Sequence, residues 1–496
     1  MSDRLTSLDV SFLYLEEPTT AMHTGSVMIF SDPGDGLAFE RLLQHVEARI
    51  AHVPRYRQRL RWIPGRLGNP VWVDDEKFDI TYHVRRSAVP RPGSEEQLCE
   101  LVARLQSRRL DRNRPLWELI FVEGLEQDRF AVVTKVHQAM VDGIHAVHLA
   151  QVVLDAAPSE LEMPYGIWRP APEPSMVELV AGALADSVRR PRDAAETVRA
   201  GFGDLQVTAG HVIETMGGIA RTVVHVTRAP ASPLNQEISE HRRYAMVSTD
   251  LQDYRRVRNA FIGRNWAQRR ARSEATTGPL PPPVPTMIGI HGTTTTVNDV
   301  VLATLSGALR AWLLGRGEAV PPKSVVRALV PVSVRAAEPG DVTAIGHRVA
   351  SLIVELPTGE PSPAMRLHQI AYQTKAHREA GQAVDAPAIA GMAGFAPPTL
   401  HILGARLASS LSRRLFNLVV TNVPGPQVPL YLGPAQMLST YPVIPLARQQ
   451  ALSVGLTSYD GGVFYGLYAD RDAMADLDDL AQCLTDSLAE LKDAAR

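Results

Sequence analysis

The chain is too long to be built around a single hydrophobic core. Its 496 residues exceed the roughly 250 to 300 residues at which single cores stop growing and chains divide into domains. At least two packed domains are therefore expected. Hydrophobic residues make up 45% of the chain and charged residues 21%, which is ordinary for globular proteins.

Charge and cysteine content narrow the class of protein. The formal net charge of -2 gives no electrostatic reason to expect a nucleic-acid partner. The two cysteines, Cys99 and Cys483, both fall in helix-like segments, so neither a disulfide framework nor a metal cluster is indicated. Acidic residues interrupt the apolar runs at the amino end, and no run of about 18 uncharged apolar residues occurs. We expect a cytoplasmic protein without metal or cofactor, whose membrane contact is at most peripheral.

Residues 1–165 alternate short strand-like runs with amphipathic helical segments. The run "TGSVMIF" (24–30) is typical of a strand, and "EEQLCELVARLQSRRL" (95–110) repeats its apolar residues every three to four positions, as a helix does. This alternation predicts an α/β domain.

A Pro-rich break and a helical linker are predicted over residues 166–232. After "WRPAPEPS" (168–175), Ser175 and Glu178 have the spacing of a capping box, and "MVELVAGALADSV" carries apolar residues at helical spacing. This stripe could meet a membrane, since Arg189, Arg190 and Arg192 follow it, but packing on the protein itself is the more common role of such a stripe.

Residues 233–496 form a second predicted α/β domain. Buried strands are expected in "SVVRALVPVSVR" (324–335) and "NLVVTNVPGP" (417–426), with a helix over "VNDVVLATLSGALRAWLLG" (297–315). The segment 264–294 is basic, then rich in Pro, Gly and Thr, and predicts an exposed, flexible insertion.

One segment, "VVTKVHQAMVDGIHAVHLAQVV" (132–153), concentrates candidate chemistry. An apolar strand (130–136) is expected to end in a tight turn that closes at Asp142 and Gly143, where a helix begins. A structural interpretation, in which these residues only cap a helix, accounts for each of them singly. His145 and His148 lie one helical turn apart and could form a metal pair or a displaced base, but no third ligand is near, and packed or solvent-facing roles are favoured.

Eight segments in order make the sequence resemble the bacterial wax ester synthase/diacylglycerol acyltransferase family, particularly its actinobacterial triacylglycerol synthase members. They are "SLDVSFLYLEEPTTAMHTGSVMIF", "LDRNRPLWELIFVEGL", "HQAMVDG", "SPLNQEISEHRRYA", "TVNDVVLATLSGALR", "PVSVR", "TNVPGP" and "GLYADRDAMADLDDL". The resemblance covers nearly the whole chain.

This resemblance implies a pair of chloramphenicol-acetyltransferase-like domains with the active site in a channel between them. A long-chain acyl-CoA donor would enter from one side and a diacylglycerol or fatty-alcohol acceptor from the other. The family signature is HHxxxDG, whose second His is taken to be the general base. The matching positions here are His137, Gln138, Asp142 and Gly143, so Gln138 occupies the catalytic position.

Gln138 changes the chemistry that the segment can perform. Attack of a hydroxyl on a thioester needs a group that accepts the hydroxyl proton, which a neutral imidazole does and a Gln amide does not. Because general-base catalysis contributes about 10² to 10⁴ in rate, we expect weak rather than absent activity. His137 is not expected to substitute, since adjacent residues leaving a strand point to opposite sides.

Three other matched motifs supply candidate substrate-binding residues, each with a structural alternative. In the first, Pro115, Leu116 and Trp117 are expected to begin a strand and bury the indole, and the resemblance implies that they shape the channel. The second is the pair Asn298 and Asp299. The resemblance makes this pair important for activity or architecture, and its structural alternative is a plain helix N-cap.

The third motif ends a predicted strand in a Pro-Gly turn, where Asn422 could donate to substrate. His347 stands where relatives usually carry Asn, which is a second departure from the family pattern. Two hypotheses follow: an acyl-CoA-dependent O-acyltransferase acting at the inner membrane face or on lipid bodies, and a catalytically weakened acyl-CoA- or lipid-binding relative with a sequestering or regulatory role. A Gln138 introduced on purpose to trap a substrate complex is a third possibility that one sequence does not separate from a natural one.

Overall fold

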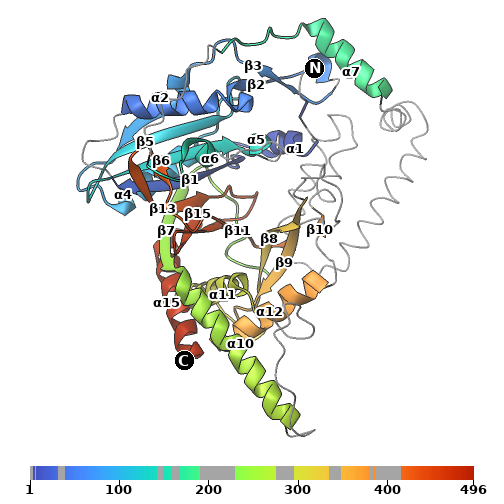
Figure 1. The fold of residues 1–496 in the computed structure, drawn as a ribbon. Coiled ribbons are helices and arrows are strands. Elements are labelled where there is room, and N and C mark those ends of the chain that lie inside the picture. Colours follow the sequence, from blue (N-terminus) through green and yellow to red (C-terminus); the bar gives the residue numbers. More distant parts are fainter. Residues whose placement is uncertain are drawn as a thin grey trace, which may run out of the picture.

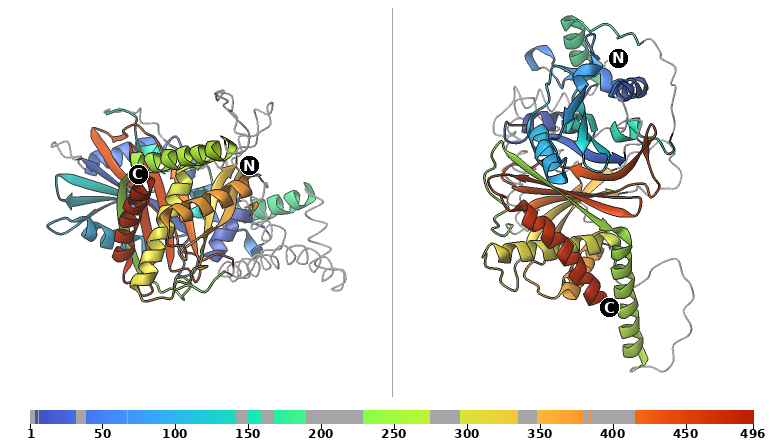
Figure 2. Two further views of the ribbon diagram at one scale, coloured as in Figure 1. Left: turned by 90° about the horizontal axis from the view of Figure 1, so that it is seen from below. Right: turned by 90° about the vertical axis from the view of Figure 1, so that its left-hand side faces the viewer.

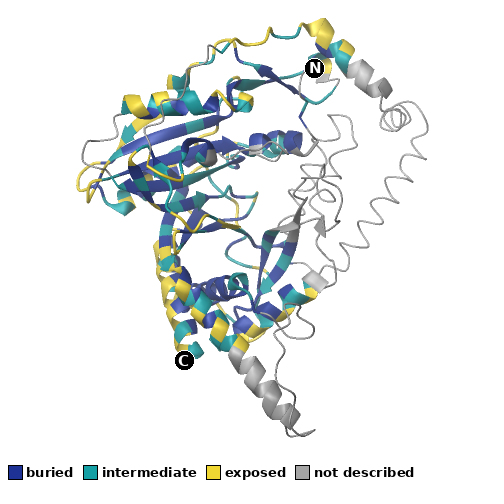
Figure 3. Ribbon diagram, viewed as in Figure 1, coloured by how far each residue is buried: buried dark blue, intermediate teal, exposed yellow. Residues whose placement is uncertain are grey.

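The computed structural model describes residues 4–5, 7–31, 39–66, 68–141, 149–158, 168–189, 229–274, 295–334, 348–379, 384–385 and 415–496. Two sheet-based units lie one above the other in Figure 1. Their strands are mostly buried, while the helices at the lower edge expose one face (Figure 3).

The first unit is built on a six-stranded sheet with the order β12-β13-β1-β6-β5-β4. The strands are β1 (His23–Ser31), β4 (Val84–Ala88), β5 (Trp117–Leu125), β6 (Arg129–His137), β12 (Tyr431–Leu432) and β13 (Ala435–Val443). The helices are α1 (Ser7–Leu15), α2 (Phe39–Ile50), α3 (Ile80–His83), α4 (Glu95–Ser107), α5 (Gln138–Val141) and α6 (Leu149–Val153). Two short strands, β2 (Gln58–Arg61) and β3 (Val71–Asp74), and the 3-10 turns η1 (Pro54–Arg57) and η2 (Pro64–Arg66) complete it.

The second unit is built on a seven-stranded sheet with the order β10-β9-β8-β11-β14-β15-β7. Its strands are β7 (Arg242–Asp250), β8 (Val326–Val334), β9 (Arg348–Leu356), β10 (Val384–Asp385), β11 (Leu418–Pro424), β14 (Leu452–Tyr459) and β15 (Gly462–Asp470). Its helices are α10 (Leu251–Glu274), α11 (Val297–Gly315), α12 (Pro363–Glu379) and α15 (Leu477–Ala495). These helices lie on the side of the sheet that faces away from the first unit (Figure 2).

The strand β13 joins the two units. It comes from the carboxyl-terminal part of the chain but pairs antiparallel with β1, with Gly25 opposite Val443. Its residues alternate between buried and less buried positions, so one face enters the core of the first unit. Gly466 on β15 lies so close to this strand that an added Cβ would meet the Pro442 carbonyl oxygen at 1.8 Å. Close backbone packing therefore connects the second sheet to the strand that crosses into the first.

Most elements predicted from sequence periodicity are confirmed. Helix α11 begins and ends at the predicted residues, and Thr296 caps it through a capping box with Asp299. It is the one described helix apolar and long enough to cross a membrane, but 72% of its apolar window is buried, as in the core helix of a globular unit. Helix α4 also begins with a capping box, made by Ser94 and Gln97.

Helix α7 (Met176–Arg189) forms where the helical linker was predicted. Glu178 accepts hydrogen bonds from the backbone and hydroxyl of Ser175, and Leu179 is buried against Val71 and Val73 of β3. Within the described part of the stripe, Leu179 therefore packs on the protein, whereas Met176 is exposed. Arg190 and Arg192 lie outside the described residues.

One local prediction is wrong. Residues 264–274, which we expected to begin a flexible insertion, continue helix α10; Ala, Arg, Gln and Glu have high helix propensity, so a basic segment without an apolar stripe still extends a helix. The rest of that segment, 275–294, lies outside the described residues. The strand β6 is followed directly by α5, a single helical turn at the place where a tight turn was predicted, and the backbone N–H groups of His137 and Gln138 are both bonded to neighbouring segments. The predicted domain limits remain a prediction. Residues 431–443, which belong to the predicted second domain, pair with the sheet of the first unit.

Candidate functional site

The candidate catalytic segment begins at the last residue of β6. The backbone N–H of His137 donates to the Leu116 carbonyl at 3.0 Å, and that of Gln138 donates to the Met22 carbonyl at 2.9 Å. Both neighbours thus hold the end of the strand: Leu116, which immediately precedes β5, and Met22, which immediately precedes β1. Asp142 and Gly143, the other two catalytic candidates, and also His145 and His148, lie outside the described residues.

The His137 imidazole is fully buried and both of its nitrogens face protein groups. Nδ1 accepts the backbone N–H of Ala139 at 3.0 Å, which assigns the ring hydrogen to Nε2. Nε2 lies 3.8 Å from Oε1 of Glu16. Burial lowers the pKa of His137 to about 4, and the Glu16 carboxylate only partly opposes this shift. At neutral pH the ring is therefore uncharged, buried and held in one tautomer.

Glu16 is itself held by Arg112. The guanidinium donates to Oε2 of Glu16 from Nε at 2.9 Å and from Nη2 at 2.6 Å, and Nη2 also donates to the Leu13 carbonyl. Arg112 thus fixes Glu16, whose Oε1 lies near Nε2 of His137 without a hydrogen bond between them, and Nδ1 of the same ring is bonded to the first turn of α5. Sequence analysis missed Glu16 and Arg112 as site residues. Both fall in matched segments, "LYLEEP" and "LDRNRPLW", but 96 residues separate them and no spacing rule connects them.

Gln138 differs from His137 in its surroundings. Gln138 is half-buried whereas His137 is fully buried. That their side chains point to different sides stays a prediction. No hydrogen bond from the Gln138 amide to another described residue is present. The partly exposed amide can therefore meet a molecule that enters from solvent, and the enclosed His137 ring cannot.

The predicted burial of the Trp117 indole is confirmed. Nε1 donates to the Tyr56 carbonyl at 2.8 Å, and the ring stacks on His83 with centroids 4.8 Å apart. The side chain is completely buried, so it supports the sheet. Within this motif it is the Leu116 carbonyl that touches the candidate segment, while Pro115 is buried beside it.

The structure brings two of the predicted binding residues together in the second unit. Asn422 near the carboxyl end of β11 donates from Nδ2 to Oδ1 of Asn298 in the first turn of α11, at 2.9 Å. Asp299 is buried, where it completes the capping box with Thr296 and accepts the Thr374 hydroxyl at 2.7 Å. The N-cap is therefore Thr296, and the Asn298–Asp299 pair lies just inside the helix. His347 lies outside the described residues.

The two groups of predicted residues stay separate in the described part of the chain. Among these residues, no hydrogen bond or ion pair joins the His137 group to the Asn298–Asn422 pair. No group of three or more His, Cys, Asp or Glu side chains that could hold a metal ion occurs among them either.

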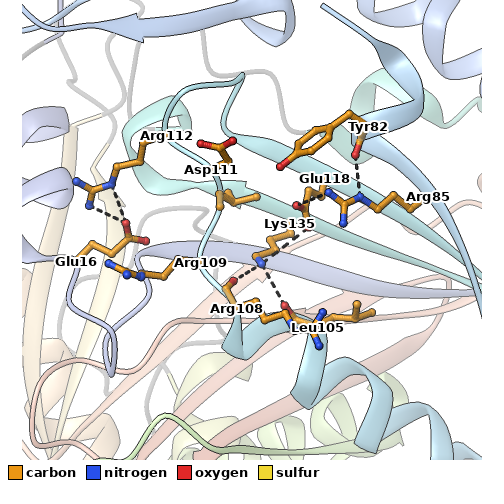
Figure 4. Close-up of a pocket in the computed structure, with 11 residues that line it drawn as sticks. Glu16, Tyr82, Arg85, Leu105, Arg108, Arg109, Asp111, Arg112, Glu118 and Lys135 are labelled. Carbon is orange, nitrogen blue, oxygen red and sulfur yellow. Dashed lines mark hydrogen bonds and ion pairs between the residues drawn. The ribbon is translucent and has the colours of Figure 1, made fainter.

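A pocket of about 490 Å³ opens beside the His137 group (Figure 4). Glu16 and Arg112 lie on one side of it, and Tyr82, Arg85 and Glu118 on the other, as Figure 4 shows. Lys135, two residues before His137 on β6, lies between them, and its burial lowers its pKa to about 8. The pocket was not predicted, since its lining comes from segments far apart in sequence.

Comparisons with known proteins identify relatives over the whole chain. Residues 5–263 match the wax ester synthase/diacylglycerol acyltransferase catalytic domain, and residues 345–492 match the corresponding C-terminal domain. The chain is 32% identical over 491 residues to the probable diacylglycerol O-acyltransferase tgs1 of Mycobacterium tuberculosis, which is 99% of this chain and 96% of the relative. It is 44% identical to tgs3 of the same organism over 264 residues, 53% of this chain and 97% of the relative.

Solved structures agree with this assignment. The wax ester synthase/diacylglycerol acyltransferase from Marinobacter aquaeolei VT8 superposes with a TM-score of 0.67 at 29% identity, covering 99% of both chains. The starter condensation domain of rhizomide synthetase superposes with a TM-score of 0.52 at 11% identity, covering 100% of this chain and 94% of that one, which shows a shared fold alone. The predicted two-domain α/β fold class is confirmed.

Proposed function

The chain belongs to the wax ester synthase/diacylglycerol acyltransferase family, and from this premise we propose that it transfers a long-chain fatty acyl group from acyl-CoA to diacylglycerol or a fatty alcohol at a low rate. The acceptor hydroxyl oxygen would form a bond to the thioester carbonyl carbon as the carbon–sulfur bond breaks. The hydroxyl proton leaves as this happens, and CoA departs as the thiol once the sulfur is protonated. The rate of this reaction depends on whether a protein group beside the acceptor hydroxyl can accept its proton.

The proposal of a low rate rests on the different surroundings of His137 and Gln138. His137 accepts the Ala139 N–H through Nδ1 and directs its N–H toward Glu16, so no lone pair of this ring faces an acceptor alcohol. Gln138, at the position of the family's general base, offers an amide oxygen that orients a hydroxyl but does not take its proton. Positioning of the substrates then supplies the remaining rate enhancement.

The same observation favours a second candidate function. A chain that keeps the family fold but lacks a base at position 138 would bind acyl-CoA or the lipid acceptor without efficient turnover. Sequestration or regulation of these ligands is the corresponding role.

Product formation from labelled palmitoyl-CoA separates the two. We would compare dipalmitoylglycerol and hexadecanol as acceptors for the unaltered protein, for Gln138→His and for Gln138→Asn as a matched amide control. Slow turnover by the unaltered protein that rises with His and not with Asn supports the low-rate transferase. An inert unaltered protein that binds palmitoyl-CoA supports the binding role, and rapid turnover that is lost in His137→Ala contradicts both.

We further propose that the protein works in the cytoplasm, in peripheral contact with the inner membrane face or lipid bodies, because both proposed acceptors are lipids. At the start of α7, Met176 is 63% and Val177 77% exposed, which leaves apolar side chains available to a lipid surface. Flotation with phospholipid vesicles should be weakened by Met176→Ser with Val177→Ser. Equal flotation of the variant and the unaltered protein would show that these α7 side chains do not bind the lipid surface.

A further inference from the structure

Two exposed arginines follow helix α4 and separate two pockets. Arg108 and Arg109 line the pocket of about 490 Å³ beside Glu16 and also a second pocket of about 540 Å³. Both volumes lie within the roughly 300 to 1,000 Å³ that is usual for small-molecule sites. The two arginines are therefore accessible from both pockets at once.

The first pocket has an excess of positive charge that its own carboxylates do not neutralise. Five of its eleven lining residues are Arg or Lys and three are Asp or Glu. Glu16 is paired with Arg112, and Glu118 lies within 4.0 Å of both Arg85 and Lys135. The remaining carboxylate, on Asp111, accepts two hydrogen bonds from Asn113 and has Arg114 at 3.7 Å. Within the described parts of the chain, neither Arg108 nor Arg109 forms an ion pair.

The loop that carries these arginines is anchored at both ends. Lys135, whose side chain is 1% exposed, donates from Nζ to the carbonyl oxygens of Leu105 and Arg108. At the other end, Arg112 holds the loop to Glu16 and Leu13. An anchored loop presents its guanidinium groups at a lower entropic cost of binding than a mobile one would.

The second pocket lies where the two units meet. Its lining combines Pro18, Ser107 and the two arginines with Glu240 and His241, which precede β7 of the second unit. Next to it, the Arg242 guanidinium donates to the Thr19 carbonyl and pairs with Asp470 at 3.3 Å, so the two units are tied together at this place.

We propose that Arg108 and Arg109 bind the phosphate groups of the nucleotide end of CoA at this junction. The inference rests on the proposed function, which requires an acyl-CoA donor. Arginine is suited to the role because its planar guanidinium donates two parallel hydrogen bonds to phosphate oxygens. Glu16, which forms the wall of the first pocket, is also the group that faces His137. A nucleotide bound at the arginines would thus lie beside Glu16 and Lys135, close to the segment that carries the catalytic position.

Calorimetric titration of the full chain with CoA tests the assignment. We would compare the unaltered protein with Arg108→Gln/Arg109→Gln and with Arg104→Gln, an exposed arginine one turn earlier that lines neither pocket. The double variant should raise the Kd for CoA about 10- to 100-fold, as expected for lost charge-assisted hydrogen bonds, while Arg104→Gln leaves it unchanged. The Kd of Arg108→Lys/Arg109→Lys for CoA should lie between that of the unaltered protein and that of the double Gln variant. The Kd values for adenosine 3′,5′-bisphosphate should rank the variants in the same order.

Several results would overturn the assignment in distinguishable ways. An unchanged Kd for CoA in the double variant would show that the arginines do not bind the donor. The proposed acyl transfer from palmitoyl-CoA would not be affected by this result. Lost binding to vesicles that contain phosphatidate, with unchanged affinity for CoA, would mean that the arginines bind a lipid phosphate. No binding of CoA to the unaltered protein contradicts the proposed function together with the site.

Discussion

Two buried histidines of the first unit should make its stability fall steeply between pH 7 and pH 5. Burial lowers the pKa of His137 to about 4 and that of His83 to about 4, from an ordinary value of 6.5. The unfolded chain therefore binds protons between pH 6.5 and 4 that the folded unit does not. The contribution of each ring to stability is complete above pH 6.5 and is lost as the pH falls toward 4.

The structure sets the size of this effect. With these pKa values, going from pH 7 to pH 5 costs roughly 2 kcal/mol of unfolding free energy for each ring, or about 4 kcal/mol for the pair. For a unit of this size each kcal/mol corresponds to about 2–4 °C, so the melting temperature of the first unit should fall by about 10 °C. Burial also lowers the pKa of His23, which adds to the loss in the same direction.

Thermal unfolding at pH 7 and pH 5 measures the difference in melting temperature. Single substitutions show how much of it each histidine causes. His137→Asn retains an acceptor for the Ala139 N–H, and His83→Asn retains a donor for the Trp117 carbonyl. Each should lower stability at pH 7 but reduce the loss between the two pH values by roughly 2 kcal/mol, the share of one ring. His52→Asn, an exposed control, should leave the loss unchanged. The reasoning is refuted if both buried-histidine variants retain the full pH difference.

Three further outcomes are expected. Gln138→His should raise turnover by about 10² to 10⁴, measured as labelled ester formed per minute, and an unchanged rate would show that the base acts elsewhere. Glu16→Gln leaves Arg112 without its buried carboxylate. Because this arginine is one-third exposed, we expect the free energy of unfolding in urea to fall by about 2–4 kcal/mol, near the low end for broken buried pairs. A variant as stable as the unaltered chain would contradict the pairing. Gly466→Ala should lower the melting temperature by more than about 5 °C since its Cβ would meet the Pro442 carbonyl at 1.8 Å, while Gly315→Ala, with open space around the added carbon, should not.

The local elements follow from short-range physics that the sequence contains. Helix α11 could be predicted to the residue because its capping residues and its apolar period agree. Helix α10 includes residues 264–274, which were predicted to begin a flexible insertion, since a basic segment can be helical without an apolar stripe. Within the candidate site, the matched motifs led to the hypothesis that Gln138 is a substituted position, which stays a prediction, and they predicted the buried Trp117 indole, which is confirmed.

The sequence by itself determined the fold class and the family, and it led to the proposal that position 138 lacks a proton acceptor, because periodicity and ordered motifs are properties of residues near one another in the chain. Only the tertiary structure decided that His137 is neutral and enclosed, that Arg112 holds Glu16 beside it, and that Asn298 meets Asn422. It also decided that β13 crosses into the first sheet and that Arg108 and Arg109 lie between two pockets. Each of these depends on contacts between segments roughly a hundred or more residues apart, whose geometry is set by how the two sheets pack and by no local pattern.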